Sequence, residues 1–184
     1  MNTKPKSKVR WQGIPAPLRR HPWLTGLSLV LALVAALSLS FADRQIVINT
    51  SPSMAPGVYV KAPGEPGVGR IVDFVVPPPA RGYLRARTGN DGAQWYLLKP
   101  VVAGPGDHVR KAGGWLEING RRLVLVLTQD GDGRPLPRWE GDRTLAPGEF
   151  FVVSDRIPTS FDSRYFGPLT RDQIASVRRP LVTW

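Results

Sequence analysis

The longest apolar segment of the chain runs from Trp23 to Ala42 and contains no charged residue. Leucine, valine and alanine occupy every face of the helix it would form, so it lacks the polar stripe of a helix that packs on a soluble core. About 20 residues at about 1.5 Å each span about 30 Å, the thickness of the hydrocarbon layer of a bilayer. The pattern predicts one N-terminal transmembrane helix.

The charges around this segment are asymmetric. Six basic residues precede it, with no acidic residue among them: Lys4, Lys6, Lys8, Arg10, Arg19 and Arg20. Such a flank stays in the cytoplasm, so the residues after 43 are expected outside, in the periplasm of a bacterial inner membrane. We therefore expect a cytoplasmic tail over 1–22, an anchor over 23–42 and a periplasmic β-rich domain over 43–184. Because Ser40-Phe41-Ala42 resembles a cleavage site, a cleavable signal peptide stays an alternative, although the apolar run and its leader are long for one.

Beyond the anchor, short apolar segments alternate with turn residues, which is typical of strands. Asn119-Gly120 between two such segments predicts a hairpin. Two polar stretches, Arg81–Gly92 and Gln129–Arg143, are expected as loops, the first with weak hairpin character. Only Thr170–Ala175 resembles the start of a helix, so the fold class is mainly β, with antiparallel strands. The predicted strands are Gln45–Asn49, Val58–Lys61, Arg70–Val76, Trp95–Ala103, Trp115–Ile118, Leu123–Thr128, Phe150–Ser154 and Ile174–Val177.

Composition excludes several classes of function. The chain has no cysteine, so it offers neither disulfides nor a thiolate nucleophile. The six basic residues before the anchor account for much of the net charge of +11, and membrane orientation explains them, so no nucleic-acid partner is expected. No His/Asp/Glu cluster has the spacing of a metal site, and Gly104-Pro105-Gly106 is not followed by the Lys and Ser/Thr of a phosphate loop. We expect neither a metal nor a cofactor.

A candidate nucleophile lies just after the anchor, in Ser51-Pro52-Ser53-Met54-Ala55-Pro56-Gly57. The proline and glycine residues hold this stretch in a turn, which can expose a serine hydroxyl. The chain has only two histidines, and one of them, His21, is on the cytoplasmic flank. A Ser-His-Asp triad would therefore rest on His108, whose only adjacent carboxylate is Asp107.

Lys99 is the stronger candidate for a base, because it is the one charge in the apolar segment Trp95–Ala103. Burial disfavours the ammonium form, and a neutral amine can accept a proton from a serine. Bringing a lysine pKa from about 10.4 to about 7 corresponds to roughly 5 kcal/mol. The alternative is that Lys99 points outward from a half-buried strand.

A third block, Ser160-Phe161-Asp162-Ser163-Arg164, follows an apolar strand near the C-terminus. The order of the three blocks resembles the type I signal (leader) peptidase family: Ser-Met-x-Pro after an anchor, a lysine before a Pro-Gly-Asp turn, then Ser-x-Asp-Ser-Arg. The resemblance covers residues 49 to 169. It implies a Ser-Lys dyad protease with a β-rich, partly barrel-like fold.

The resemblance assigns roles residue by residue. Ser53 matches the nucleophile and Lys99 its base. Ser51 matches a hydroxyl that helps the Ser53 N–H to form an oxyanion hole, and Ser160 matches a serine that orients the lysine. Asp162 and Arg164 match a structural ion pair beside the site.

The chain also departs from the family pattern. The usual Gly-Asp-Asn-Arg opening of the third block reads Ser154-Asp155-Arg156-Ile157, and Pro100 rather than arginine follows the lysine. Pro56-Gly57-Val58-Tyr59 and the third block look more like the TraF-type branch, whose members mature pilin precursors in conjugative transfer. In that branch an aspartate matching Asp162 is implicated in activity, so a structural and a catalytic role both stay open.

The expected function is a membrane-anchored serine endopeptidase that cleaves an exported precursor, a pilin-like polypeptide, with hydrolysis or cyclisation as outcomes. Its expected partners are that polypeptide, the lipid bilayer and the conjugation or secretion machinery. Two alternatives remain. One is a general type I signal peptidase that acts on secretory preproteins. The other is a non-catalytic anchored β module of a secretion or pilus complex.

Overall fold

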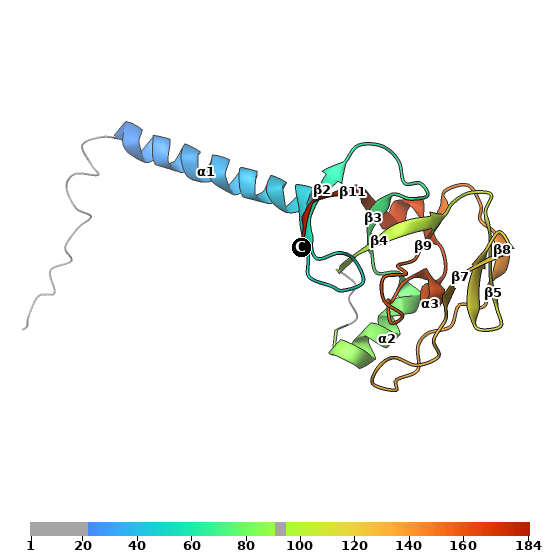
Figure 1. Cartoon of the computed structure of the whole chain (residues 1–184). Helices are drawn as coiled ribbons and strands as arrows, with labels where there is room; N and C mark the ends of the chain where they lie inside the picture. Colours follow the sequence, from blue (N-terminus) through green and yellow to red (C-terminus); the bar gives the residue numbers. More distant parts are fainter. Residues whose placement is uncertain (1–21, 91–94) are drawn as a thin grey trace, which may run out of the picture. The chain divides into compact units, whose positions relative to one another are not determined.

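The computed structural model describes residues 22–90 and 95–184, and within these ranges it describes residue 22 and residues 36–44 by their backbone alone. The chain divides into two compact units, Met1–Asp43 and Arg44–Trp184. Helix α1 (Pro22–Gln45) covers the segment expected to be the anchor (Figure 1). In the part of the chain that is described, no helix is long and apolar enough to cross a membrane. A membrane anchor over residues 23–42 stays a prediction from the sequence.

The second unit is built on antiparallel strands. Its larger sheet has the strand order β1-β2-β11-β3-β4-β9-β10, and all neighbours are antiparallel. This confirms the mainly β, antiparallel fold class. The strands are β1 (Ile46–Asn49), β2 (Gly57–Ala62), β3 (Ile71–Val75), β4 (Tyr96–Ala103), β9 (Glu149–Val152), β10 (Leu169–Thr170) and β11 (Ile174–Thr183).

A smaller antiparallel sheet has the order β7-β6-β5-β8. Figure 1 shows β5, β7 and β8 at the end of this unit away from β2 and β11. The predicted hairpin is present, because Asn119 and Gly120 join β6 to β7 with positive φ angles of 50° and 77°. These angles belong to the turn type that Asn-Gly favours. The strands are β5 (His108–Ala112), β6 (Trp115–Ile118), β7 (Arg121–Leu125) and β8 (Asp142–Thr144).

The largest difference from expectation is helix α2 (Pro78–Thr88), which lies where we expected a loop or weak hairpin over Arg81–Gly92. Prolines at the start of a helix remove no needed hydrogen bond, so Pro78 and Pro79 can form the first residues of α2. Ala80, Tyr83 and Leu84 form its buried face. Gly89, at φ 74°, caps the C-terminus in the left-handed conformation. Residues 91 and 92 lie outside the described residues.

Other differences are smaller. Strand β11 continues to Thr183, six residues beyond the predicted end at Val177, and passes Pro180 through a register shift. The helix start expected at Thr170–Ala175 is the single 3-10 turn η2 (Arg171–Gln173), with a capping box between Thr170 and Gln173. The polar loop Gln129–Arg143 runs into β8, and neither β5 nor β8 was expected.

Strand β4 lies between β3 and β9, and the hydrophobic core packs against these three strands. Val72, Phe74, Val101 and Val152 on these central strands are almost fully buried, and they pack with residues of α2 and of helix α3 (Ser163–Phe166). Lys99 therefore lies in the middle of the larger sheet, opposite Val72 of β3.

Gly57 marks a close approach at the other side of this sheet. A Cβ at this position would lie 2.3 Å from the Val182 carbonyl oxygen, so only glycine lets β2 pair with the end of β11. The turn that carries Ser53 is thereby fixed directly before β2.

Candidate active site

The candidate nucleophile lies in a tight turn between β1 and β2. The Met54 N–H donates to the Ser51 carbonyl oxygen at 3.3 Å, which closes the turn around Pro52 and Ser53. Only 5% of Ser53 is exposed to solvent. The turn places the hydroxyl inside a cleft rather than on the open surface.

Lys99 and Ser53 meet in this cleft, although they are 46 positions apart. Lys99 Nζ donates a short hydrogen bond to Ser53 Oγ. Only 5% of Lys99 is exposed, so the alternative in which this lysine points outward is wrong. The structure thus brings the predicted nucleophile and the predicted base into direct contact.

The surroundings of Lys99 change its acidity. Burial lowers the pKa of Lys99 from the usual 10.5 to about 8; the negative charge of Asp162 opposes this lowering and the positive charge of Arg164 adds to it. A lysine with a pKa of about 8 is partly neutral near physiological pH. Its amine then has a lone pair that can accept the Ser53 proton.

Ser51 lies beside the same hydroxyl. Its Oγ is 3.0 Å from Ser53 Oγ, and the Ser53 N–H donates to it at 3.4 Å. A hydroxyl and a backbone N–H that lie this close together can both donate to one carbonyl oxygen of a substrate. The role of Ser51 in an oxyanion hole stays a prediction that this proximity favours.

A hydrogen-bonded group near Ser53 and Lys99 consists of Ser160, Asp162 and Arg164. Arg164 Nε donates to Asp162 Oδ1 at 2.8 Å, and Nη2 donates to Oδ2 at 2.9 Å, so the expected ion pair is present and nearly fully buried. Ser160 Oγ donates to Asp162 Oδ2 at 2.8 Å. The proton of Ser160 is therefore directed at Asp162, and orientation of Lys99 by Ser160 stays a prediction.

Ser53 and Lys99 line a cleft of about 370 Å³. Another part of its wall is formed by Tyr83, Leu84 and Arg87 of α2 and by Asp130 of the loop before β8. The Tyr83 hydroxyl donates to Asp130 Oδ2 at 2.9 Å, which ties this wall together. The sequence analysis missed this wall because it placed no helix there, although Ala80, Tyr83 and Leu84 have helical spacing.

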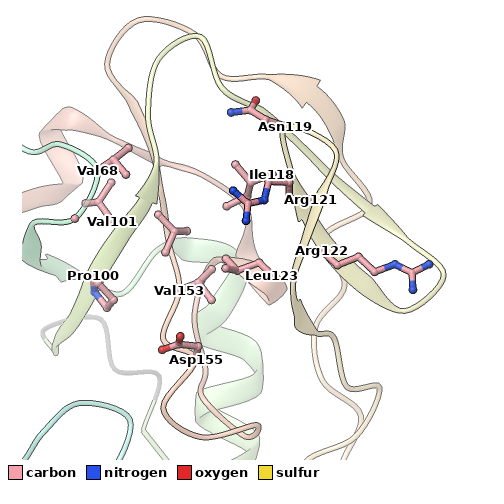
Figure 2. Close-up of a pocket in the computed structure, with 12 residues that line it drawn as sticks. Val68, Pro100, Val101, Ile118, Asn119, Arg121, Arg122, Leu123, Val153 and Asp155 are labelled. Atoms are coloured by element: carbon pink, nitrogen blue, oxygen red, sulfur yellow. The ribbon is translucent and has the colours of Figure 1, made fainter.

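Another cavity, of about 650 Å³, lies between β4 and the β6–β7 hairpin. Figure 2 shows Val68 and Val101 on one side of it, and Ile118 and Arg121 of the hairpin on the other. Neither Ser53 nor Lys99 lines it. The chemistry that we infer belongs to the smaller cleft.

His108 lies on β5 in the smaller sheet, where its Nε2 is 2.9 Å from Asp142 Oδ1. Ser53 instead precedes β2 of the larger sheet and contacts Lys99. The geometry thus supports a lysine rather than His108 as the base.

Proteins with similar sequences come from plasmid and conjugal transfer systems. Two "Plasmid transfer protein TraF" sequences from Escherichia coli are 37% and 36% identical to this chain. The first alignment covers 74% of this chain and 82% of the relative, and the second covers 84% and 93%. A "Probable conjugal transfer protein TraF" from Sinorhizobium fredii is 30% identical over 90% of this chain and 92% of its own length.

A solved structure is also similar in part. A crystal structure of a signal peptidase I from Enterococcus faecalis V583 matches 63% of this chain and 98% of its own chain, with 24% identity and a TM-score of 0.38. An overlap of this size carries no argument for the site.

The family that matches the chain covers nearly all of it, including Ser53 and Lys99. Residues 20–183 match the family described as "Signal peptidase, peptidase S26". On this match and on the identity to the TraF proteins, the chain belongs to the S26 family of signal peptidases.

Proposed function

We propose that this protein is a serine endopeptidase in which Ser53 is the nucleophile and Lys99 the general base. The observation that carries the proposal is the direct contact between Lys99 Nζ and Ser53 Oγ inside a buried cleft. Membership of a peptidase family supports the same class of reaction.

The proposed reaction begins when neutral Lys99 accepts the proton of Ser53. Ser53 Oγ then forms a bond to the scissile carbonyl carbon, and the carbonyl oxygen takes up negative charge. The Ser53 N–H and the Ser51 hydroxyl, which lie side by side, would donate to this oxygen. The proton held by Lys99 passes to the leaving amine as the C–N bond breaks, which leaves an acyl-enzyme on Ser53.

We propose a pilin precursor of a conjugation system as the substrate, because the similar proteins are described as plasmid or conjugal transfer proteins. The acyl-enzyme has two chemical fates. Water gives a linear product, whereas the amino terminus of the same peptide gives a cyclic one. The proposal also includes an inner-membrane anchor over residues 23–42, with the peptidase domain in the periplasm, on the sequence pattern described above.

Mass spectrometry of a co-expressed pilin precursor tests the proposal. Ser53→Ala and Lys99→Met are each expected to leave the precursor uncut while the protein still accumulates. Processing that survives either change would contradict the dyad. Cyclic and linear products differ by one water, so the same spectra determine the fate of the acyl-enzyme. A general block of secretion on loss of the protein, rather than a selective defect in conjugation, would contradict the pilin substrate.

A further inference from the structure

The turn that carries Ser53 is held from one side by Asn49, the last residue of β1. Asn49 Nδ2 lies within hydrogen-bond distance of three carbonyl oxygens, those of Ser51 at 3.0 Å, Met54 at 3.2 Å and Ala55 at 3.1 Å. Its Oδ1 accepts from the Ser51 N–H at 3.2 Å. Asn49 is 8% exposed, so few water molecules can replace these bonds. One buried amide therefore organises the backbone of the whole turn.

The same turn is held from the other side by Ser154, which follows β9. Ser154 Oγ donates a short hydrogen bond to the Ser53 carbonyl oxygen, across 101 positions of sequence. The Ser154 N–H donates to Asp162 Oδ2 at 3.1 Å, and the Ser154 carbonyl oxygen accepts from Arg164 Nη2 at 3.2 Å. Ser154 thus connects the backbone of the nucleophile to the buried ion pair behind it.

These contacts restrain the backbone on both sides of the peptide unit that joins Pro52 to Ser53. Asn49 holds the carbonyl of Ser51, the ring of Pro52 fixes its own φ angle, and Ser154 holds the carbonyl of Ser53. The peptide unit between Pro52 and Ser53, which carries the Ser53 N–H, is bracketed by these restraints. The direction of that N–H, and of the Cα–Cβ bond that carries Ser53 Oγ, is therefore set before a substrate binds.

We propose that Asn49 and Ser154 are positioning residues that aim Ser53 Oγ at Lys99 and the Ser53 N–H at the oxygen of the scissile carbonyl. The inference rests on the proposed Ser53–Lys99 function. A misplacement of about 1 Å in reacting groups can reduce a rate about 10²-fold, so loss of one restraint has a measurable effect. The two residues act through Ser53 and need no contact with the substrate.

The test uses the full-length protein in detergent and a fluorescent penem, an acylating agent for serine. The final stoichiometry of labelling counts the folded sites, whereas the rate constant of labelling reports how well each site is aligned. Ser154→Ala is expected to lower the rate constant about 10- to 100-fold, with stoichiometry and the pH midpoint near those of the wild type. Ser154→Thr, which keeps the hydroxyl, is expected to recover most of the rate.

A matched control is Ser163→Ala. Ser163 is also fully buried, and its Oγ accepts from the Val152 N–H at 3.1 Å, so its loss removes a comparable hydrogen bond away from the turn. This variant is expected to lose stability but to keep the wild-type rate constant per site.

The outcomes separate the two proposals. If Ser154→Ala lowers only stoichiometry or the melting temperature, while the rate constant per site stays at the wild-type value, the positioning role is wrong. If the wild type is not labelled at all, the proposed function fails first. Should Ser154→Ala not fold, Ser154→Cys, which is close in volume but a weaker donor, gives the same comparison, and an unchanged rate constant there counts equally against the inference.

Discussion

Asp162 and Arg164 form a doubly hydrogen-bonded ion pair, at 2.8 and 2.9 Å, and its members act on Lys99 in opposite directions. The carboxylate of Asp162 raises the pKa of Lys99, and the guanidinium of Arg164 lowers it. The two charges oppose each other, and burial is the largest cause of the lowering of this pKa to about 8. The ion pair can thus support the site without abolishing the basicity that the reaction needs.

The pH dependence of the reaction follows from the state of Lys99. The base must be neutral, and Lys99 loses its proton as the pH rises through about 8. We expect log(kcat/KM) for cleavage of a precursor peptide to rise with a slope of about one below pH 8 and to level off above it. A profile that is flat from pH 6 to pH 9 would contradict Lys99 as the titrating base.

Asp162→Asn tests the electrostatic coupling. Because the charge of Asp162 raises the pKa of Lys99, its removal is expected to lower that pKa and to move the rising limb to lower pH. Loss of one member of a buried pair also destabilises the fold, by about 3–5 kcal/mol, so the profile must be recorded well below the melting temperature.

The control for this measurement is Asp107→Asn. Asp107 accepts from the Gly104 N–H at 2.8 Å in the turn between β4 and β5, so this change also removes a hydrogen-bonded carboxylate. Its pH profile is expected to match that of the wild type. The coupling between Asp162 and Lys99 would be contradicted if the rising part of the pH profile of Asp162→Asn stayed in place or moved to higher pH.

Lys99→Met is expected to inactivate the protein and to stabilise it. A pKa lowered from 10.5 to about 8 corresponds to about 3 kcal/mol of destabilisation by the buried ammonium at neutral pH, at about 1.36 kcal/mol per pKa unit. The unfolded state binds more protons between pH 8 and pH 10.5, so wild-type stability rises with pH across that window. The variant has no such rise.

Urea unfolding at pH 7 and pH 10 measures the gain in stability of the variant and the rise of wild-type stability with pH. Lys61→Met is the control, because Lys61 on β2 is exposed and its replacement is expected to change stability by less than about 0.5 kcal/mol. Equal stability of wild type and Lys99→Met at pH 7 would mean that burial of this lysine carries no energetic penalty.

Local patterns in the sequence predicted much of the site. Ser53 stood out because proline and glycine surround it, and Lys99 because it is a lone charge in an apolar strand. Those patterns act over a few residues, so they can be recognised without the fold. The pairing of the two residues was inferred from the scarcity of histidine and from the family resemblance, because no local rule brings positions 46 apart together.

The parts that were missed depend on tertiary contacts or on competing local signals. The hydrogen bond of Ser154 to Ser53 spans 101 positions, and the sequence marked Ser154 only as a departure from a family pattern. Helix α2 was missed because the polar stretch Arg81–Gly92 favoured a loop, and the prolines before it directly follow a predicted strand. A proline triplet can end one element and also begin the next, and the spacing of Tyr83 and Leu84 favoured the helix.

A buried ion pair joins β3 to β11. Arg178 Nη2 lies 2.7 Å from Asp73 Oδ2, and both side chains are at most 5% exposed. Asp73 also accepts from Ser176 Oγ at 2.5 Å, and Arg178 donates to the Gln45 carbonyl oxygen at 2.9 Å. The pair therefore links the strand beside β4 to the first residues of the domain.

Arg178→Met is expected to destabilise the protein by about 3–5 kcal/mol, because it leaves the Asp73 carboxylate buried without its cation. The double variant Asp73→Leu/Arg178→Met, which removes both charges, is expected to recover most of this loss. The exposed pair of Glu65 and Arg171, at 2.8 Å, is the comparison, and Arg171→Met is expected to change stability by at most about 1 kcal/mol. Urea unfolding of the full-length variants in detergent distinguishes these cases. If the double variant were as unstable as Arg178→Met, the pair would be needed for its specific hydrogen bonds to Ser176 and Gln45, and not merely for the neutralisation of a buried charge.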